Sequence, residues 1–181
     1  FQDKLINDKN RFVHVYYDID STEWENWGIF TGINFDIIAF HRATGYKWLY
    51  EYDSKRVEDA FPTPRTWEFT SDILKIYTGE KRKSLVNGTI GEGAGTTFFS
   101  FLRHKEKLPS IDKILNGENL FSSDPDIVYL LISALGSKFK ENTKLGNRII
   151  EYSYEMPEDQ VEFKVLLIRD MAADMTPVAG I

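Results

Sequence analysis

The chain has 181 residues, of which 42% are hydrophobic and 14% aromatic, so it can fold around a core and is not of a disordered composition. Its net charge of −6, with no long basic run, disfavours nucleic-acid binding through phosphate neutralisation. The absence of cysteine excludes disulfides, cysteine-ligated metals and thiol catalysis, and it permits the reducing cytoplasm, where we expect the protein.

Residues 11–20, RFVHVYYDID, are rich in strand-forming types, and apolar side chains occupy both alternating sets, which is typical of a buried strand. A lone strand is unstable, and no second convincing strand follows it, so we expect its partner strands upstream of residue 1. The first residue is Phe1 instead of methionine, and no signal peptide follows, so we expect a fragment that begins inside a longer protein. No apolar run approaches the ~20 residues of a membrane span, so we expect no membrane partner.

The rest of the sequence predicts helices, recognised by capping residues, helical spacing and glycine ends. In chain order, the predicted helical segments cover residues 21–32, 34–45, 63–77, 91–107, 109–117, 123–139, 142–156 and 157–175. Residues 46–52 are predicted as a helical turn or an extended piece. Gly79 is expected to end the predicted helix 63–77. Segment 123–139, capped by Ser123 or Asp124, is apolar on nearly all sides and is predicted to be the central core helix.

The start of segment 63–77 places a cation where a helix disfavours one. Thr63 fits the N-cap and Pro64 the first helical position. Arg65 follows in the first turn, at the positive end of the helix dipole. A bound anion would reverse this preference, because a helix N-terminus offers free N–H groups and a guanidinium binds phosphate in a fork. From physics alone, the alternatives are a solvent-exposed arginine and an arginine paired with Glu58 or Asp59.

Residues 88–97, GTIGEGAGTT, have the glycine content of a phosphate-binding loop without its pattern. The lysine of the Walker A motif is absent, and G-x-G-x-x-G is not matched either. Glu92 would also repel phosphate. We therefore predict a loop and a close approach of two helices, which small residues permit.

Other candidate chemistry is weak. His14, His41 and His104 show no metal-binding spacing; we predict His14 in the strand and the other two on helix surfaces, and no metal site. Asp124 and Asp126 fit a helix start better than an acid/base pair. A group of aromatic residues could stack on a base or sugar, but a core or subunit contact is the preferred interpretation. The group comprises Trp24, Trp27, Phe30, Trp48, Tyr50 and Tyr52.

Three stretches occur in order: NRFVHVYYDIDSTEWENW (10–27), FPTPRTWEFTSDIL (61–74) and GTIGEGAGTTFFSFLR (88–103). Together they resemble the C-terminal part of bacterial and phage AAA+ ATPases of the MoxR type, over roughly residues 9–135. In that family an N/D-R-F sequence closes the α/β nucleotide-binding core, and an S/T-P-R motif begins a helix of the lid that follows. TPRTWEF is the most specific match.

The resemblance implies a mainly α fold, a helical bundle like an AAA+ lid. Residues 1–19 would be the last strand of the core, residues 20–135 the lid, and residues 136–181 a C-terminal helical extension. Arg65, with Pro64 in the same motif, would be the sensor-2 arginine that reaches the γ-phosphate of ATP. Arg11 would be the arginine finger that points to a neighbouring subunit's nucleotide, although in related clades such an arginine holds the subunit interface.

The chain lacks both Walker motifs, so alone it is expected neither to bind ATP tightly nor to hydrolyse it, and to carry no cofactor. For the full-length protein the resemblance implies ATP and Mg²⁺, a missing N-terminal AAA+ core, neighbouring subunits of a hexameric ring, and a protein substrate that is remodelled. The alternatives are a helical protein-interaction module with no nucleotide role, and a phage or bacterial structural protein. The apolar face of residues 161–175 must be buried, either on the lid or against another chain.

Overall fold

The computed structural model describes residues 18–52 and 60–173, and every regular element in these ranges is a helix. The α-helices are α2 (Ser21–Thr31), α3 (Phe35–Ala43), α4 (Pro64–Ile76), α5 (Gly79–Ile90), α6 (Glu92–Leu102), α7 (Ile111–Leu115), α8 (Pro125–Glu141), α9 (Gly146–Glu155) and α10 (Val161–Ala173). Short 3₁₀ helices cover η2 (Arg103–Lys107), η3 (Thr143–Leu145) and η4 (Glu158–Gln160). The mainly helical prediction is confirmed, whereas residues 1–17, with most of the predicted strand, lie outside the described residues.

Side-chain caps fix several helix starts where the sequence placed them. Asp20 accepts hydrogen bonds from the backbone N–H groups of Thr22 and Glu23 at the start of α2. Asn34 caps α3 in the same way, and Asp124 caps α8. Each cap satisfies donors that the first helical turn leaves unpaired.

Helix α5 was not predicted. Its sequence, GEKRKSLVNGTI, is polar around most of its circumference, and only Val86 and Ile90 are buried, so it shows no clear apolar period. Gly79, which was expected to end the preceding helix, instead begins α5 with a positive φ of 61°. Gly91, with a φ of 84°, separates α5 from α6. Both positions use the left-handed conformations that glycine tolerates.

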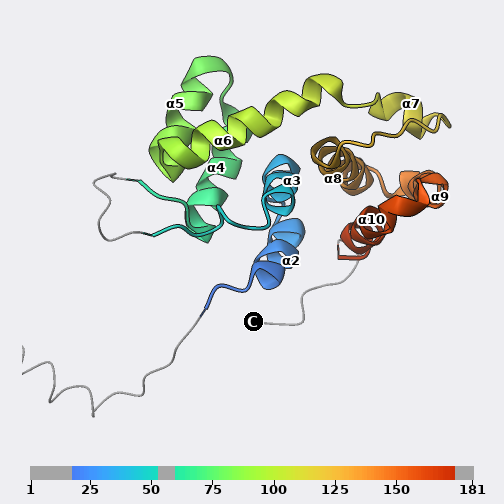
Figure 1. Cartoon of the computed structure of the whole chain (residues 1–181), viewed down its shortest axis with the longest axis horizontal. Coiled ribbons are helices and arrows are strands. Elements are labelled where there is room, and N and C mark those ends of the chain that lie inside the picture. Colours follow the sequence, from blue (N-terminus) through green and yellow to red (C-terminus); the bar gives the residue numbers. More distant parts are fainter. Residues whose placement is uncertain (1–17, 53–59, 174–181) are drawn as a thin grey trace, which may run out of the picture.

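Two apolar cores meet along α8. The first is built mainly from α2 to α6 and centres on Phe40, Trp67 and Phe98. The second joins α7 to α10 around residues such as Leu135 and Tyr152. In Figure 1, α8 lies between α3 and α10, and it packs against both. The prediction of a central helix is therefore confirmed, and α8 continues across residues 135 and 136, where the sequence analysis divides lid from extension.

The close helix approach predicted for the glycine-rich segment is also confirmed, at Gly95. A Cβ added to this residue would lie 3.2 Å from the Asn87 Cα and would clash with the Asn87 side chain. Helices α5 and α6 can therefore pack closely because this position lacks a side chain. None of the helices in the described ranges combines the length and the hydrophobicity needed to cross a membrane.

Candidate functional site

The TPR sequence forms a capped helix start. The Thr63 Oγ1 accepts a hydrogen bond from the Thr66 backbone N–H at 3.1 Å, and the Thr66 Oγ1 accepts one from the Thr63 N–H at 2.7 Å. This reciprocal pair is a capping box, and Pro64 occupies the first helical position as predicted. Trp67 anchors the same turn, because its buried indole donates to the Trp48 carbonyl oxygen at 2.8 Å. The backbone around Arg65 is thus held from both sides.

Arg65 itself is exposed. Its guanidinium lies 5.6 Å from the centre of the Phe69 ring, one turn along α4, and this ring is itself 47% exposed. Among the described residues, Arg65 has no hydrogen-bond or ion-pair partner, and the first turn of α4 contains no acidic residue. Glu58 and Asp59, the partners considered in the sequence analysis, lie outside the described residues, as does Arg11.

Arg65 lines none of three cavities formed by the described residues. These cavities lie elsewhere: one of about 460 Å³ beside the start of α3, and two along α9 and α10. The Arg65 guanidinium, which is always charged, lies at the N-terminus of α4. This position fits one side of a phosphate-binding site. The other walls of such a site are not supplied by the described residues next to Arg65.

The glycine-rich segment contributes no phosphate-binding loop in the described structure. Gly88 lies within α5, while Gly93 and Gly95 lie within α6. Backbone N–H groups inside a helix are directed to its own carbonyl oxygens and do not form a cradle for an anion. The predicted close approach of two helices is confirmed, but the predicted loop is wrong, because Gly91 alone separates α5 from α6.

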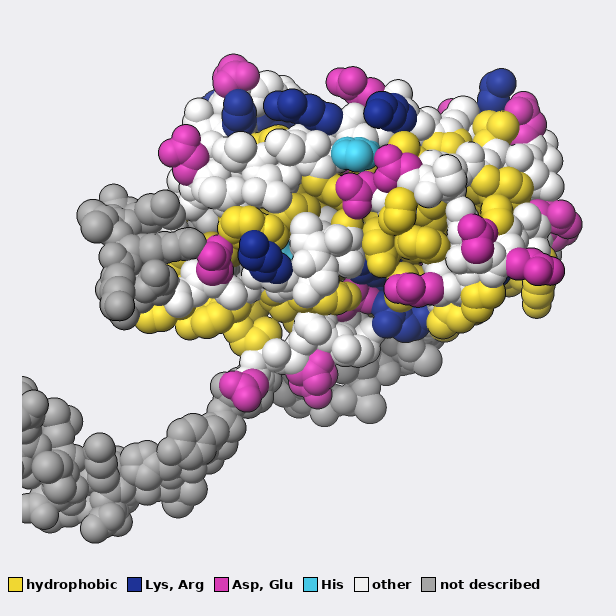
Figure 2. Space-filling model, viewed as in Figure 1, with side chains coloured by type: hydrophobic (Ala, Val, Ile, Leu, Met, Phe, Trp, Pro, Cys, Tyr) yellow, Lys and Arg dark blue, Asp and Glu magenta, His cyan; other side chains and the backbone are white. Residues whose placement is uncertain are grey.

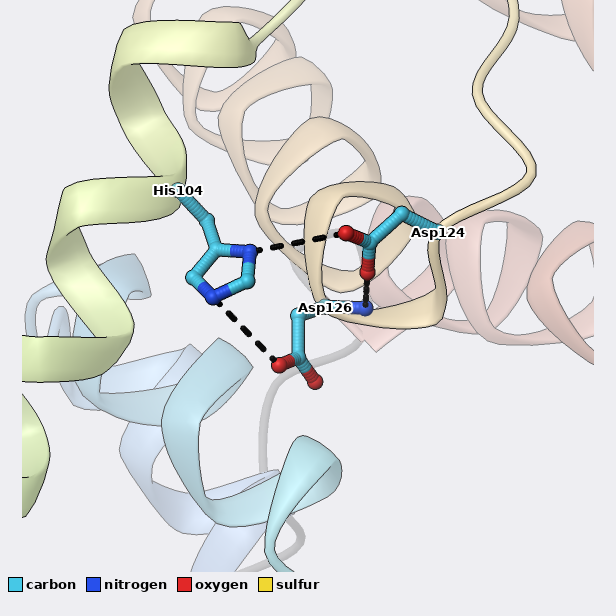
Figure 3. A group of neighbouring side chains, drawn as sticks. All are labelled: His104, Asp124 and Asp126. Atoms are coloured by element: carbon cyan, nitrogen blue, oxygen red, sulfur yellow. Dashed lines mark hydrogen bonds and ion pairs between the residues drawn. The ribbon is translucent and has the colours of Figure 1, made fainter.

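A second group of polar side chains joins η2 to the start of α8 (Figure 3). The Nδ1 of His104 lies 3.6 Å from an Asp124 carboxylate oxygen, and its Nε2 lies 3.8 Å from an Asp126 oxygen. Asp124 also accepts a hydrogen bond from the Asp126 backbone N–H, at 3.1 Å. The prediction that both aspartates begin a helix is confirmed, but their contact with His104 was not predicted.

These three residues could in principle hold a metal ion. In the structure, however, the two ring nitrogens of His104 face different carboxylates (Figure 3). One candidate ligand atom of each residue nevertheless lies within 4.8 Å of the other two. The His104 ring lies between the two carboxylates and so links η2 to α8. Because all three side chains are partly exposed, such a link contributes little to stability.

A buried network of charged residues was missed by the sequence analysis. The Arg42 guanidinium donates to both carboxylate oxygens of Glu25, at 3.2 and 3.0 Å, and to both of Asp170, at 2.8 and 2.6 Å. Glu25, Arg42 and Asp170 are at most 6% exposed. Arg169 and the Tyr46 hydroxyl also contact Glu25. The network therefore ties α10 to α2 and α3.

Burial and pairing act in opposite directions on these charges. Burial raises the pKa of Glu25, and its hydrogen bonds with Arg42 oppose that effect only in part. For Arg42 burial alone would lower the pKa, but the hydrogen bonds and attraction of Asp170 and Glu25 outweigh it and raise the pKa. Arg42 and Arg169 supply two positive charges beside the carboxyl groups of Glu25 and Asp170. Charged groups are buried in proteins only when they are paired in this way. We interpret the network as a structural clamp.

His41 is not on a helix surface as predicted but fully buried. Its ring lies edge-on to Trp24 and Trp67, with ring centres 5.0 and 4.6 Å away. Neither ring nitrogen has a hydrogen-bond partner among the described residues, and burial lowers the pKa of His41 to about 3. The prediction failed because every residue from 37 to 42 of α3 is buried, so this stretch leaves no side of the helix at the surface.

The aromatic group of the sequence analysis separates in the structure. Trp24 belongs to the first core, and Trp27 and Trp48 pack against it, as the preferred interpretation expected. Phe30, Tyr50 and Tyr52 are instead 44 to 58% exposed. No ring contact among the described residues joins these three to one another.

Of the three predicted site residues, Pro64 and Arg65 lie together in the first turn of α4. Arg11 lies outside the described residues. In comparisons with protein-family models, curated proteins and solved structures, none matches this chain.

Proposed function

We propose that this chain is the helical lid and C-terminal region of an AAA+ ATPase of the MoxR type, in which Arg65 acts as the sensor-2 arginine. The observation that carries the proposal is the state of Arg65. It is a permanent cation at the start of a helix, exposed, and without an ion-pair partner among the described residues. That position is unfavourable by a few tenths of a kcal/mol, roughly, unless an anion is bound there.

The local structure supports a phosphate as that anion. Thr63 and Thr66 fix the helix start, so the Arg65 backbone is held before any ligand arrives. The guanidinium can then donate two parallel hydrogen bonds to oxygens of a terminal phosphate. Such a contact stabilises negative charge on that phosphate during its transfer. When bound, ATP with Mg²⁺ supplies the phosphoryl group that is transferred to water.

Arg65 is exposed and lines none of the three cavities named above for the described residues, which supports a site shared with another part of the assembly. We propose that the N-terminal AAA+ core of the full-length protein supplies the Walker motifs. Neighbouring subunits of a hexameric ring would then complete the site, with Arg11 as the arginine finger, and hydrolysis would remodel a protein substrate. The cytoplasm remains the proposed location.

The test is ATP turnover by the full-length protein, whose sequence upstream of Phe1 should contain Walker A and Walker B motifs. Arg65→Ala should lower turnover by about tenfold or more, because one charge-stabilising donor is lost. Arg103→Ala is the matched control, since Arg103 is also exposed and lies at the far end of another helix, α6. Unchanged turnover in the Arg65 variant, or an upstream sequence without Walker motifs, would refute the proposal in favour of an interaction module with no nucleotide role.

A further inference from the structure

Helices α9 and α10 leave an apolar surface without a described partner. On α10, Leu167 and Met171 face the second core, whereas Val165 and Ile168 are 61% and 40% exposed. On α9, Tyr154 is 80% exposed. Figure 2 shows several hydrophobic side chains at the surface over the end of the molecule where α8, α9 and α10 lie. Contiguous exposed apolar surface of this kind is typical of an interaction site.

Two cavities make this surface concave. One, of about 530 Å³, lies along Tyr154, Val165 and Ile168, and the other, of about 370 Å³, lies towards η3. Ile150 and Ile168 line both cavities, so the two form a single groove. We call it the α9–α10 groove. The 13 residues of α10 correspond to about 20 Å of helix, at 1.5 Å per residue, which sets the length of an occupant.

The charges of the groove have one sign. Lys144, Lys164 and Arg169 are the charged residues among those that line the two cavities, and no carboxylate lines either cavity. Arg169 pairs with Glu25, whereas Lys144 and Lys164 have no ion-pair partner within the described part of the chain. A cationic groove in a chain of net charge −6 is complementary to an acidic occupant.

We propose that the α9–α10 groove binds an amphipathic helix of a partner protein, with apolar residues on one face and Asp or Glu beside them. The apolar face would lie on Ile150, Val165 and Ile168, and the carboxylates would meet Lys144 and Lys164. Binding of an amphipathic helix in an apolar groove, through side chains one helical turn apart, is a common mode of peptide recognition. A second copy of this chain fits less well, because a twofold contact of groove with groove would bring together two surfaces whose charged lining residues are all cationic.

Synthetic helical peptides of 16 residues test the proposal with the whole 181-residue chain. One peptide carries Leu on one face and Glu beside it, a second replaces each Glu with Lys, and a third scrambles the first. Fluorescence anisotropy should give the Glu peptide a Kd at least tenfold lower than that of the Lys or scrambled peptide. Lys164→Glu should reduce that preference at least tenfold.

The apolar contribution is tested by the double variant Tyr154→Gln and Val165→Gln, which should weaken binding of the Glu peptide at least tenfold. Its matched control is Ile76→Gln with Tyr50→Gln, two exposed apolar positions outside the groove, which should leave binding unchanged. Circular dichroism checks that each variant is folded. Equal binding of the Glu and Lys peptides, no binding at 1 mM, or no effect of the groove variant would overturn the proposal. Sedimentation that shows a dimer broken by the groove variant would assign the groove to a second copy and also overturn it.

Discussion

Replacing His41 with Phe should make the stability of the protein less sensitive to acid. The ring of His41 is fully buried among aromatic side chains, and neither nitrogen has a described hydrogen-bond partner. Burial lowers the pKa of His41 from 6.5 to about 3. Between these two pH values the unfolded chain binds a proton that the folded chain does not, so stability falls as the pH falls.

The size of the effect follows from the shift. Each pH unit below the unfolded pKa costs about 1.4 kcal/mol until the folded pKa is reached. At pH 5, about 1.5 units below 6.5, the loss from His41 alone is therefore about 2 kcal/mol, and at pH 7 it is close to zero. Phenylalanine has no proton to bind and a similar shape, so its cost at neutral pH is small and independent of pH.

Urea denaturation at pH 7, 6 and 5 measures this difference. The free energy of unfolding of the His41→Phe variant, minus that of the wild type, should rise by about 2 kcal/mol from pH 7 to pH 5. Taking the difference cancels the titration of the other groups that both proteins share. If His41→Phe fails to fold, His41→Leu provides the same comparison. A difference that does not change with pH would show that His41 titrates as in the unfolded chain, and the reasoning would be wrong.

Two further predictions concern packing. Arg42→Met should lower the free energy of unfolding by about 3–5 kcal/mol in urea denaturation, because it leaves the carboxylates of Glu25 and Asp170 buried without their main partner; a loss below about 1 kcal/mol would mean that the network is solvated. Gly95→Ala should destabilise by about 1–3 kcal/mol because of Asn87. Its control, Gly88→Ala, has open space and a helical backbone, so it should stabilise by about 0.4–1 kcal/mol. Equal effects of the two glycine substitutions in thermal unfolding would contradict the close approach of α5 and α6.

Local signals predicted the parts of the fold that depend on neighbouring residues. The capping residues Asp20, Asn34 and Asp124 each bind backbone groups two or three positions away, so their role is visible in the sequence. Thr63 as N-cap and Pro64 as first helical residue are local signals too, and from them the position of Arg65 in the first turn of α4 could be predicted. Helix α5 was missed because its buried face consists of few residues.

Contacts between distant residues could not be predicted in this way. Arg42 and Asp170 are 128 positions apart, and nothing in either local sequence indicates the other. His104 meets Asp124 only because a loop and α7 return the chain to η2. The burial of His41 likewise depends on helices that arrive from elsewhere in the sequence, such as α4 with Trp67.

The most direct test of the proposed function is the affinity of the full-length protein for ATP and for ADP. If Arg65 contacts the γ-phosphate, Arg65→Ala should weaken ATP binding while ADP binding stays unchanged, since ADP lacks that group. Calorimetry with both nucleotides, on the wild type, Arg65→Ala and the control Arg103→Ala, measures the ratio of the two affinities. We expect the ratio of ATP to ADP affinity to fall by about tenfold or more in the Arg65 variant alone, because one charge-assisted hydrogen bond contributes roughly 1.5–3 kcal/mol and about 1.4 kcal/mol is a factor of ten. An unchanged ratio would contradict the assignment of Arg65 to the nucleotide.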